Sequence, residues 1–244
     1  MKQTRIPFAR RGVVLPLLLA MALTACTGEK PEAMLASARD YMAKNDLKAA
    51  VIQVKNALQQ NPDLAEARYI LGVALLRSGD AVGAETELRK AMALKYPDEK
   101  TVPSLAQALL AQGQFKKLID EFAGKDLPLP AAKAAFLTAL ATAYIAERKP
   151  DLAKSTLEAA LAADPSHLPA LFLAIRRQAG GGDIDGAIAA IEGLASKTPA
   201  SYEAQKVKGD LLSAKGDLDG AVAAFRKSID INSDFLLARV SLLM

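Results

Sequence analysis

Few of the side chains that commonly carry out chemistry occur in this chain of 244 residues, which contains one histidine and one cysteine. His167 follows Asp164-Pro165-Ser166, a sequence typical of a helix start, so we expect a helix-capping or solvated imidazole rather than a catalytic one. No second histidine or neighbouring cysteine completes a metal-ligand set. We therefore predict no catalytic residue, no metal, no cofactor and no small-molecule substrate.

Two other features could suggest a reaction. The glycine run at 180–182 lacks the Lys-Ser or Lys-Thr pair that follows the glycines of a phosphate-binding loop, and it falls where a turn is expected. Carboxylates are abundant, but they occur at spacings typical of solvated helix faces. One pair among them, Glu85 with Arg89, is expected to contribute little to stability. The chain is predicted not to be an enzyme.

The formal net charge of +4 arises within the first 25 residues. Lys2, Arg5, Arg10 and Arg11 lie there without any acidic residue, and the rest of the chain has 27 basic and 27 acidic side chains. A protein that binds nucleic acid usually presents a strongly basic surface. No nucleic acid is therefore expected among the partners.

Residues 1–25 have the pattern of an export signal, because the basic residues precede an apolar run from Val13 to Leu23 that is too short to span a bilayer as a mature helix. The segment ends in LTAC, which resembles the lipobox of bacterial lipoproteins. The resemblance implies cleavage between Ala25 and Cys26 and lipid attachment, including palmitate, at Cys26. The alternative is an ordinary secretory signal followed by a chance cysteine.

A lipid at Cys26 would also determine where the protein resides. A lone thiol in an exported chain cannot form an internal disulfide, whereas lipidation accounts for its presence. Several acyl chains together anchor a protein stably. Thr27 stands where an aspartate would favour retention in the inner membrane of enteric bacteria. We expect a protein anchored to the cell envelope on the periplasmic side, with the outer membrane favoured.

Most of the chain consists of predicted helix pairs that recur every 34 residues, and the clearest pair spans Glu66 to Pro97 around a Gly79-Asp80 turn. After the signal at 1–25 and a lipidated cysteine with a short tether at 26–31, six units are predicted over 32–235. Their starts lie near 31, 65, 99, 134, 168 and 202, and 236–244 opens an incomplete seventh unit. Because that end lacks a polar capping helix, the chain is expected to be a fragment of a longer array.

Equivalent positions in the units carry similar side chains. Positions 8 and 20 are mostly small, so that two helices can cross closely, and position 24 is bulky. Position 8 is Ala38, Gly72, Ala106, Ala141, Ile175 and Gly209, position 20 is Ala50, Ala84, Leu118, Ala153, Ala187 and Ala221, and position 24 is Val54, Leu88, Phe122, Leu157, Ile191 and Phe225. This pattern resembles the tetratricopeptide repeat (TPR), although the usual tryptophan at position 4 is missing. The resemblance implies an all-α superhelical solenoid of antiparallel helix pairs.

The third unit departs from the pattern. Its second helix is predicted to be short, roughly Phe115 to Phe122, because a GKDLPLP stretch follows it. Two prolines and a glycine at this place predict a bend or a loosened stack, and a tolerated loop variation is the alternative.

In the tetratricopeptide family the first helix of each unit lines a concave groove, with positions 2, 5, 9 and 12 facing it. By that analogy the groove residues include Glu32, Leu35, Arg39, Glu66, Tyr69, Val73, Leu76, Gln107, Thr142, Phe172, Arg176, Lys206 and Asp210. Such a lining suits an extended peptide or a partner helix. Arg39, Tyr69, Phe172 and Arg176 are the candidate contacts, because aromatic and arginine side chains are enriched at hot spots. Ordinary surface packing is the alternative for each.

A narrower resemblance rests on the lipobox and two repeat stretches, QNPDLAEARY at 60–69 and LLAQGQFKKLIDEF at 109–122. These are similar to the repeat lipoproteins of PEP-CTERM/exosortase systems. The resemblance implies a scaffold for envelope proteins or peptides, alongside exopolysaccharide production and the sorting of C-terminally tagged exported proteins. The alternatives are a lipoprotein for pilus or outer-membrane protein assembly, and the N-terminal part of an envelope enzyme whose catalytic domain follows Met244.

Overall fold

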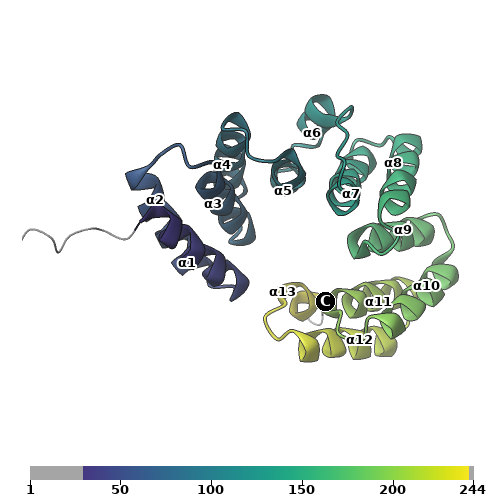
Figure 1. The fold of residues 1–244 in the computed structure, drawn as a ribbon. Coiled ribbons are helices and arrows are strands. Elements are labelled where there is room, and N and C mark those ends of the chain that lie inside the picture. Colours follow the sequence, from purple (N-terminus) through teal and green to yellow (C-terminus); the bar gives the residue numbers. More distant parts are fainter. Residues whose placement is uncertain (1–29, 242–244) are drawn as a thin grey trace, which may run out of the picture.

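In the computed structural model, residues 30–241 are described, apart from the side chain of Leu237, and they form a curved stack of helices (Figure 1). Within these residues the helices are α1 (Pro31–Ala43), α2 (Leu47–Gln60), α3 (Ala65–Arg77), α4 (Ala81–Ala93), α5 (Asp98–Ala111), α6 (Phe115–Phe122), α7 (Pro130–Ala146), α8 (Pro150–Ala163), α9 (Leu168–Gly180), α10 (Ile184–Lys197), α11 (Tyr202–Lys215), α12 (Leu218–Ile231) and α13 (Leu236–Ser241). Consecutive helices pair from α1 with α2 to α11 with α12, and α13 packs on α12. The predicted all-α solenoid is confirmed.

The predicted signal segment and Cys26 lie outside the described residues. None of the helices within 30–241 has both the length and the apolarity that a membrane span requires. The first helices of the pairs begin at residues 31, 65, 98, 130, 168 and 202. The fourth begins four residues before the unit start placed at 134, because Pro130 at its first position has a φ angle already suited to a helix.

The turn within a pair combines a residue in the left-handed region with a helix cap. At Gly79 the φ angle is 92°, which suits glycine because it has no Cβ atom. The Asp80 carboxylate then accepts a hydrogen bond from the Gly83 N–H at 2.8 Å and caps α4. The same arrangement recurs at Gly182-Asp183 before α10 and at Gly216-Asp217 before α12. The predicted turn chemistry is therefore confirmed in these pairs.

Within a pair, the helices cross closely where position 8 is glycine. A Cβ atom on Gly72 would lie 2.7 Å from Leu88 Cγ, and one on Gly209 would lie 2.4 Å from Phe225 Cε1. The bulky side chain at position 24 thus occupies the space that a side chain at position 8 would need. This explains why small and large residues alternate between these positions.

The fifth pair is an exception, because Ile175 occupies its position 8. Helix α9 packs less closely against α10 than α11 does against α12. A cavity of about 590 Å³ lies beside α9 and α10, and its lining includes Ile175, Ala190 and Gly193. The isoleucine holds the helices apart, and the small residues of α10 leave the gap unfilled.

The third pair contains the short second helix that the sequence predicts, α6 at Phe115–Phe122. Helix α6 packs only lightly on α5, which packs mainly against α4 and α7. Ion pairs connect α6 to α4 instead. Lys117 Nζ lies 2.6 Å from Glu85 Oε1, and Arg89 Nη2 lies 2.9 Å from Glu121 Oε2. These ion pairs therefore supplement the core, in which Leu118, Ile119 and Phe122 of the short helix are buried.

The expectation that Glu85 lies on a solvated helix face is wrong. Glu85 is only 8% exposed, and its carboxylate accepts hydrogen bonds from Arg89, Lys117 and Gln112. Burial acts to raise the pKa of Glu85, but the hydrogen bonds from Lys117, Arg89 and Gln112 outweigh burial and lower the pKa to about 2. The sequence shows Arg89 as a possible partner because it lies one helical turn from Glu85. Gln112 and Lys117 lie 27 and 32 residues away, so the sequence does not reveal them as partners.

Candidate functional site

The inner face of the curved stack is the candidate binding surface. Figure 1 shows α1, α3, α5, α7, α9 and α11 on the inner side of the arc, with their partner helices toward the outside. Because each pair repeats nearly the same step, the first helices follow one another along a continuous concave surface. Side chains at equivalent positions of these helices are thereby brought together.

The middle of this face contains a cavity of about 510 Å³, formed by α5, α7 and α9 with one residue of α11. Four of the predicted groove residues line it, namely Gln107, Thr142, Phe172 and Arg176. Leu110, Thr138 and Glu203 also line it and were not among the predicted residues. They occupy positions 12, 5 and 2 of their units, so the positional rule itself would have found them.

The lining residues differ in what they can offer a partner. Phe172 is 7% exposed and belongs to a core cluster with Ile191 and Val207, so it mainly forms the floor of the cavity. The Thr142 hydroxyl already donates to the Thr138 carbonyl at 2.9 Å. Gln107 makes no side-chain hydrogen bond within residues 30–241, so its amide is available to a bound backbone.

Nearer the N-terminus, Tyr69 of α3 and Tyr96, which follows α4, form an aromatic pair. The rings of Tyr69 and Tyr96 stack with centroids 4.9 Å apart. Lys100 Nζ lies 5.5 Å from the centre of the Tyr96 ring and donates to the Tyr96 hydroxyl at 3.4 Å, which raises the pKa of Lys100. Tyr96 was not predicted, because it follows α4 and lies outside the four groove positions. A flat aromatic surface next to a cation suits contact with a peptide.

The two candidate arginines form ion pairs between successive units. Arg39 pairs with Glu66, and Arg176 Nη2 lies 3.8 Å from Asp210 Oδ2, which also accepts from Lys206 at 2.8 Å. Exposed pairs of this kind contribute little to stability, so a charged partner can compete for them. The structure does not bring Arg39 and Tyr69 together with Phe172 and Arg176 in one pocket. Their roles as partner contacts stay predictions.

Residues suited to other chemistry do not gather on this face. His167 precedes α9, its side chain makes no capping hydrogen bond, and burial lowers its pKa. In the part of the chain that the structure describes, no three His, Cys, Asp or Glu side chains are placed to hold a metal ion. The inner face offers hydrogen bonds, exchangeable charges and aromatic surface, which are the components of a protein-binding site.

The fold and this face define a helical-repeat scaffold for protein–protein interaction. Models of the tetratricopeptide repeat match residues 35–97 and 172–234, and a further tetratricopeptide repeat model matches residues 134–167. The chain therefore belongs to the tetratricopeptide repeat family, whose members are typically non-catalytic scaffolds. The intervening residues 98–133 contain the irregular third pair.

Solved structures share this fold at low sequence identity. PilF of Pseudomonas aeruginosa is 17% identical, with 86% of this chain and 95% of that chain covered and a TM-score of 0.59. PilW, described as a widely conserved type IV pilus biogenesis factor, is 16% identical, with 88% and 98% covered and a TM-score of 0.63. A chain of the APC/C Cut9–Hcn1 hetero-tetramer is 14% identical, with 88% and 42% covered and a TM-score of 0.68. No curated protein matches this chain in sequence.

Proposed function

We propose that this protein is a lipid-anchored scaffold of the bacterial cell envelope that binds exported proteins or peptides on its inner face. The observation that carries the binding role is the cavity on that face, where Gln107, Arg176 and Glu203 surround a partly apolar floor. An extended segment can satisfy its backbone groups on such side chains while an apolar residue occupies the floor. The anchor rests on Cys26 within its LTAC sequence.

The proposed biological setting is PEP-CTERM/exosortase protein sorting together with exopolysaccharide production. It is supported by the resemblance of the lipobox and of the stretches at 60–69 and 109–122 to the lipoproteins of those systems. The scaffold would then hold tagged exported proteins near the membrane, with the outer membrane favoured.

A second candidate setting is pilus assembly. It is supported by the similarity in fold to PilF and PilW, which this chain matches over nearly their whole lengths. A lipid anchor and an inner binding face suit both settings, so the bound partner distinguishes them.

We expect Cys26→Ala to release the protein from membranes and to abolish its labelling with a palmitate analogue, because this thiol is the only one in the chain. Membrane fractionation followed by a sucrose gradient measures both attachment and the membrane involved. Thr27→Ala serves as the matched control and is expected to keep both label and attachment. Unchanged fractionation of the Cys26 variant would count against the anchor.

We expect a photo-reactive amino acid at Thr142, in the inner cavity, to cross-link envelope partners in living cells. The same amino acid at Leu152, which is 48% exposed on α8, is the control and should give few or no adducts. Mass spectrometry of the adducts identifies the partners. Exported proteins with the C-terminal sorting tag support the first setting, and pilus components support the second. Equal adducts from both positions would contradict binding on the inner face.

A further inference from the structure

A second pocket lies outside the inner cavity, where the α7–α8 turn approaches the end of α9. Its volume is about 540 Å³, and its apolar lining includes Ile145, Pro150 and Leu173. Arg148 from the turn and Arg176 and Arg177 from α9 also line it. No acidic residue contributes to the lining. The pocket therefore combines an apolar floor with an excess of positive charge.

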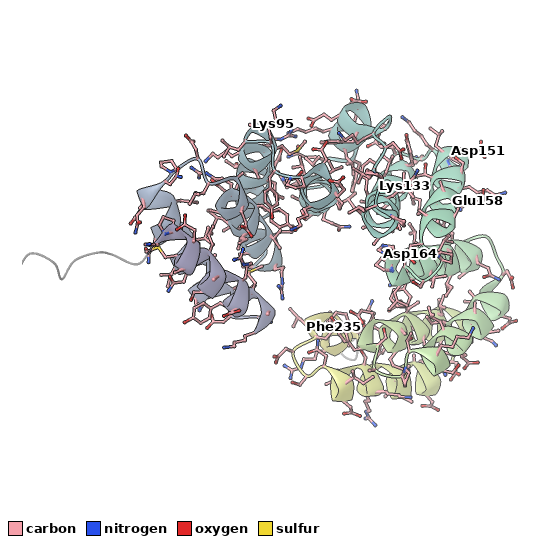
Figure 2. The ribbon with its side chains drawn as sticks, viewed as in Figure 1. Lys95, Lys133, Asp151, Glu158, Asp164 and Phe235 are labelled. Atoms are coloured by element: carbon pink, nitrogen blue, oxygen red, sulfur yellow. The ribbon has the colours of Figure 1, made fainter. Side chains whose placement is uncertain are left out.

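The positive charge of this pocket is largely uncompensated. Arg148 and Arg177 form no ion pair or side-chain hydrogen bond within residues 30–241, and Arg176 reaches Asp210 only at 3.8 Å. Asp151 and Glu158 project from α8 (Figure 2), and Glu158 lines a neighbouring pocket together with Arg177, but neither carboxylate forms an ion pair with these arginines. A ligand carboxylate would consequently meet guanidinium groups that need not first give up a strong internal partner.

The turn beside the pocket also differs from the equivalent turns of other pairs. Arg148 has a φ angle of 55°, in the region that Gly79 and Gly216 adopt in their turns. Lys149 then precedes α8, where Asp80 precedes α4 and caps it with its carboxylate. This turn thus presents Arg148 and Lys149 where the turns at Gly79 and Gly216 present a glycine and an anion, although Glu147 and Asp151 flank the two cations.

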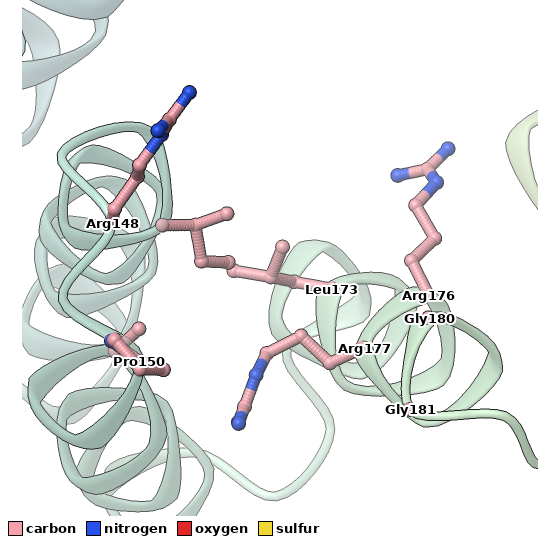
Figure 3. A pocket seen from close by; sticks show the side chains of 9 residues that line it. Arg148, Pro150, Leu173, Arg176, Arg177, Gly180 and Gly181 are labelled. Atoms are coloured by element: carbon pink, nitrogen blue, oxygen red, sulfur yellow. The ribbon is translucent and has the colours of Figure 1, made fainter.

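The arrangement of the arginines indicates the kind of ligand. Figure 3 shows the guanidinium groups of Arg148, Arg176 and Arg177 pointing in different directions around Leu173 rather than toward one point. A single phosphate is best bound by donors that converge on it. A segment with several carboxylates spaced around an aliphatic side chain matches the geometry better, because each charge and the apolar floor then have a counterpart.

We propose that this pocket binds an acidic, aliphatic segment of a protein partner. Arg176 lines both this pocket and the inner cavity, so a peptide that lies on the inner face can continue across α9 into the pocket. The proposal does not require the inner cavity to bind a ligand, since Arg148 and Arg177 line this pocket and not the inner cavity. The pocket is thus a charge-selective site at the boundary between the fourth and fifth pairs.

Fluorescence anisotropy tests the proposal with the full chain and a fluorescein-labelled peptide in which glutamate alternates with leucine. We expect Arg148→Gln and Arg177→Gln each to weaken binding about tenfold, the loss typical of one charge-assisted hydrogen bond. Replacing every glutamate of the peptide by glutamine should abolish binding, and raising the salt concentration should weaken it. Both variants are expected to keep the melting temperature, because neither side chain holds the fold together by an ion pair.

Arg226→Gln on α12 is the matched control, because Arg226 is exposed, has no ion pair in the described part of the chain and loses the same charge. It should change the affinity less than twofold. An equal loss in this variant would show that only net charge matters and would overturn the proposal. Unweakened binding by the Arg148 and Arg177 variants would overturn it too. A third result would also overturn the proposal: the protein binds alginate, an acidic polysaccharide, through Arg177 but does not bind the peptide.

Discussion

Replacing Gly209 by leucine is expected to lower the free energy of unfolding by roughly 1–3 kcal/mol. Gly209 lies where α11 crosses α12, and a Cβ atom there would approach the Phe225 ring to 2.4 Å. Phe225 is 3% exposed, so its ring cannot move aside without displacing the core around it. Urea unfolding followed by circular dichroism measures the change. Gly72→Leu tests the same contact in the second pair, where Leu88 is the opposing side chain.

Gly193→Leu is the matched control for this prediction. Gly193 also lies inside a helix, α10, but a Cβ atom there would meet no other atom within 4 Å. Since leucine has the higher helix propensity, this variant should gain up to about 1 kcal/mol. Equal melting behaviour of the Gly193 and Gly209 variants would contradict the close crossing.

Replacing Glu85 by glutamine is expected to cost about 3 kcal/mol at neutral pH, the energy that corresponds to a pKa lowered from 4.5 to about 2. The buried carboxylate accepts a hydrogen bond from Lys117 of α6, and Arg89, its partner within α4, also pairs with Glu121 of α6. The direction of the pH effect follows from the lowered pKa. The charged form favours folding above pH 4.5, and its contribution is lost as the pH falls from 4.5 through about 2.

Urea titrations between pH 7 and pH 2 measure this effect. The unsubstituted protein should lose stability steeply below pH 4.5, and the Glu85→Gln variant should lose about 3 kcal/mol less over the same range. Glu158→Gln on α8 removes an exposed carboxyl that has no ion pair within residues 30–241, so it should leave the profile nearly unchanged. Parallel profiles for Glu85→Gln and the unsubstituted protein would refute the role of this network.

The features that the sequence predicts well are those set by neighbours along the chain. Neighbouring residues determine the Gly79-Asp80 turn, because glycine readily adopts the left-handed φ angle and the following aspartate caps the next helix. The length of α6 is also determined by its neighbours in the sequence, because the GKDLPLP stretch after it cannot continue a helix. The groove positions follow from helical periodicity, which is why Gln107, Thr142 and Arg176 do line one cavity.

The sequence alone determined the solenoid, its pairing of small with bulky residues and the face that its first helices present, because each depends on a spacing repeated in every unit. Only the tertiary structure decided which side chains from different units meet. The stack of Tyr69 on Tyr96, the burial of Glu85 against Lys117 and the pocket around Arg148 and Arg177 all depend on the distance between successive helices. That distance depends on how side chains of successive units pack against one another, which the pattern within one unit does not describe.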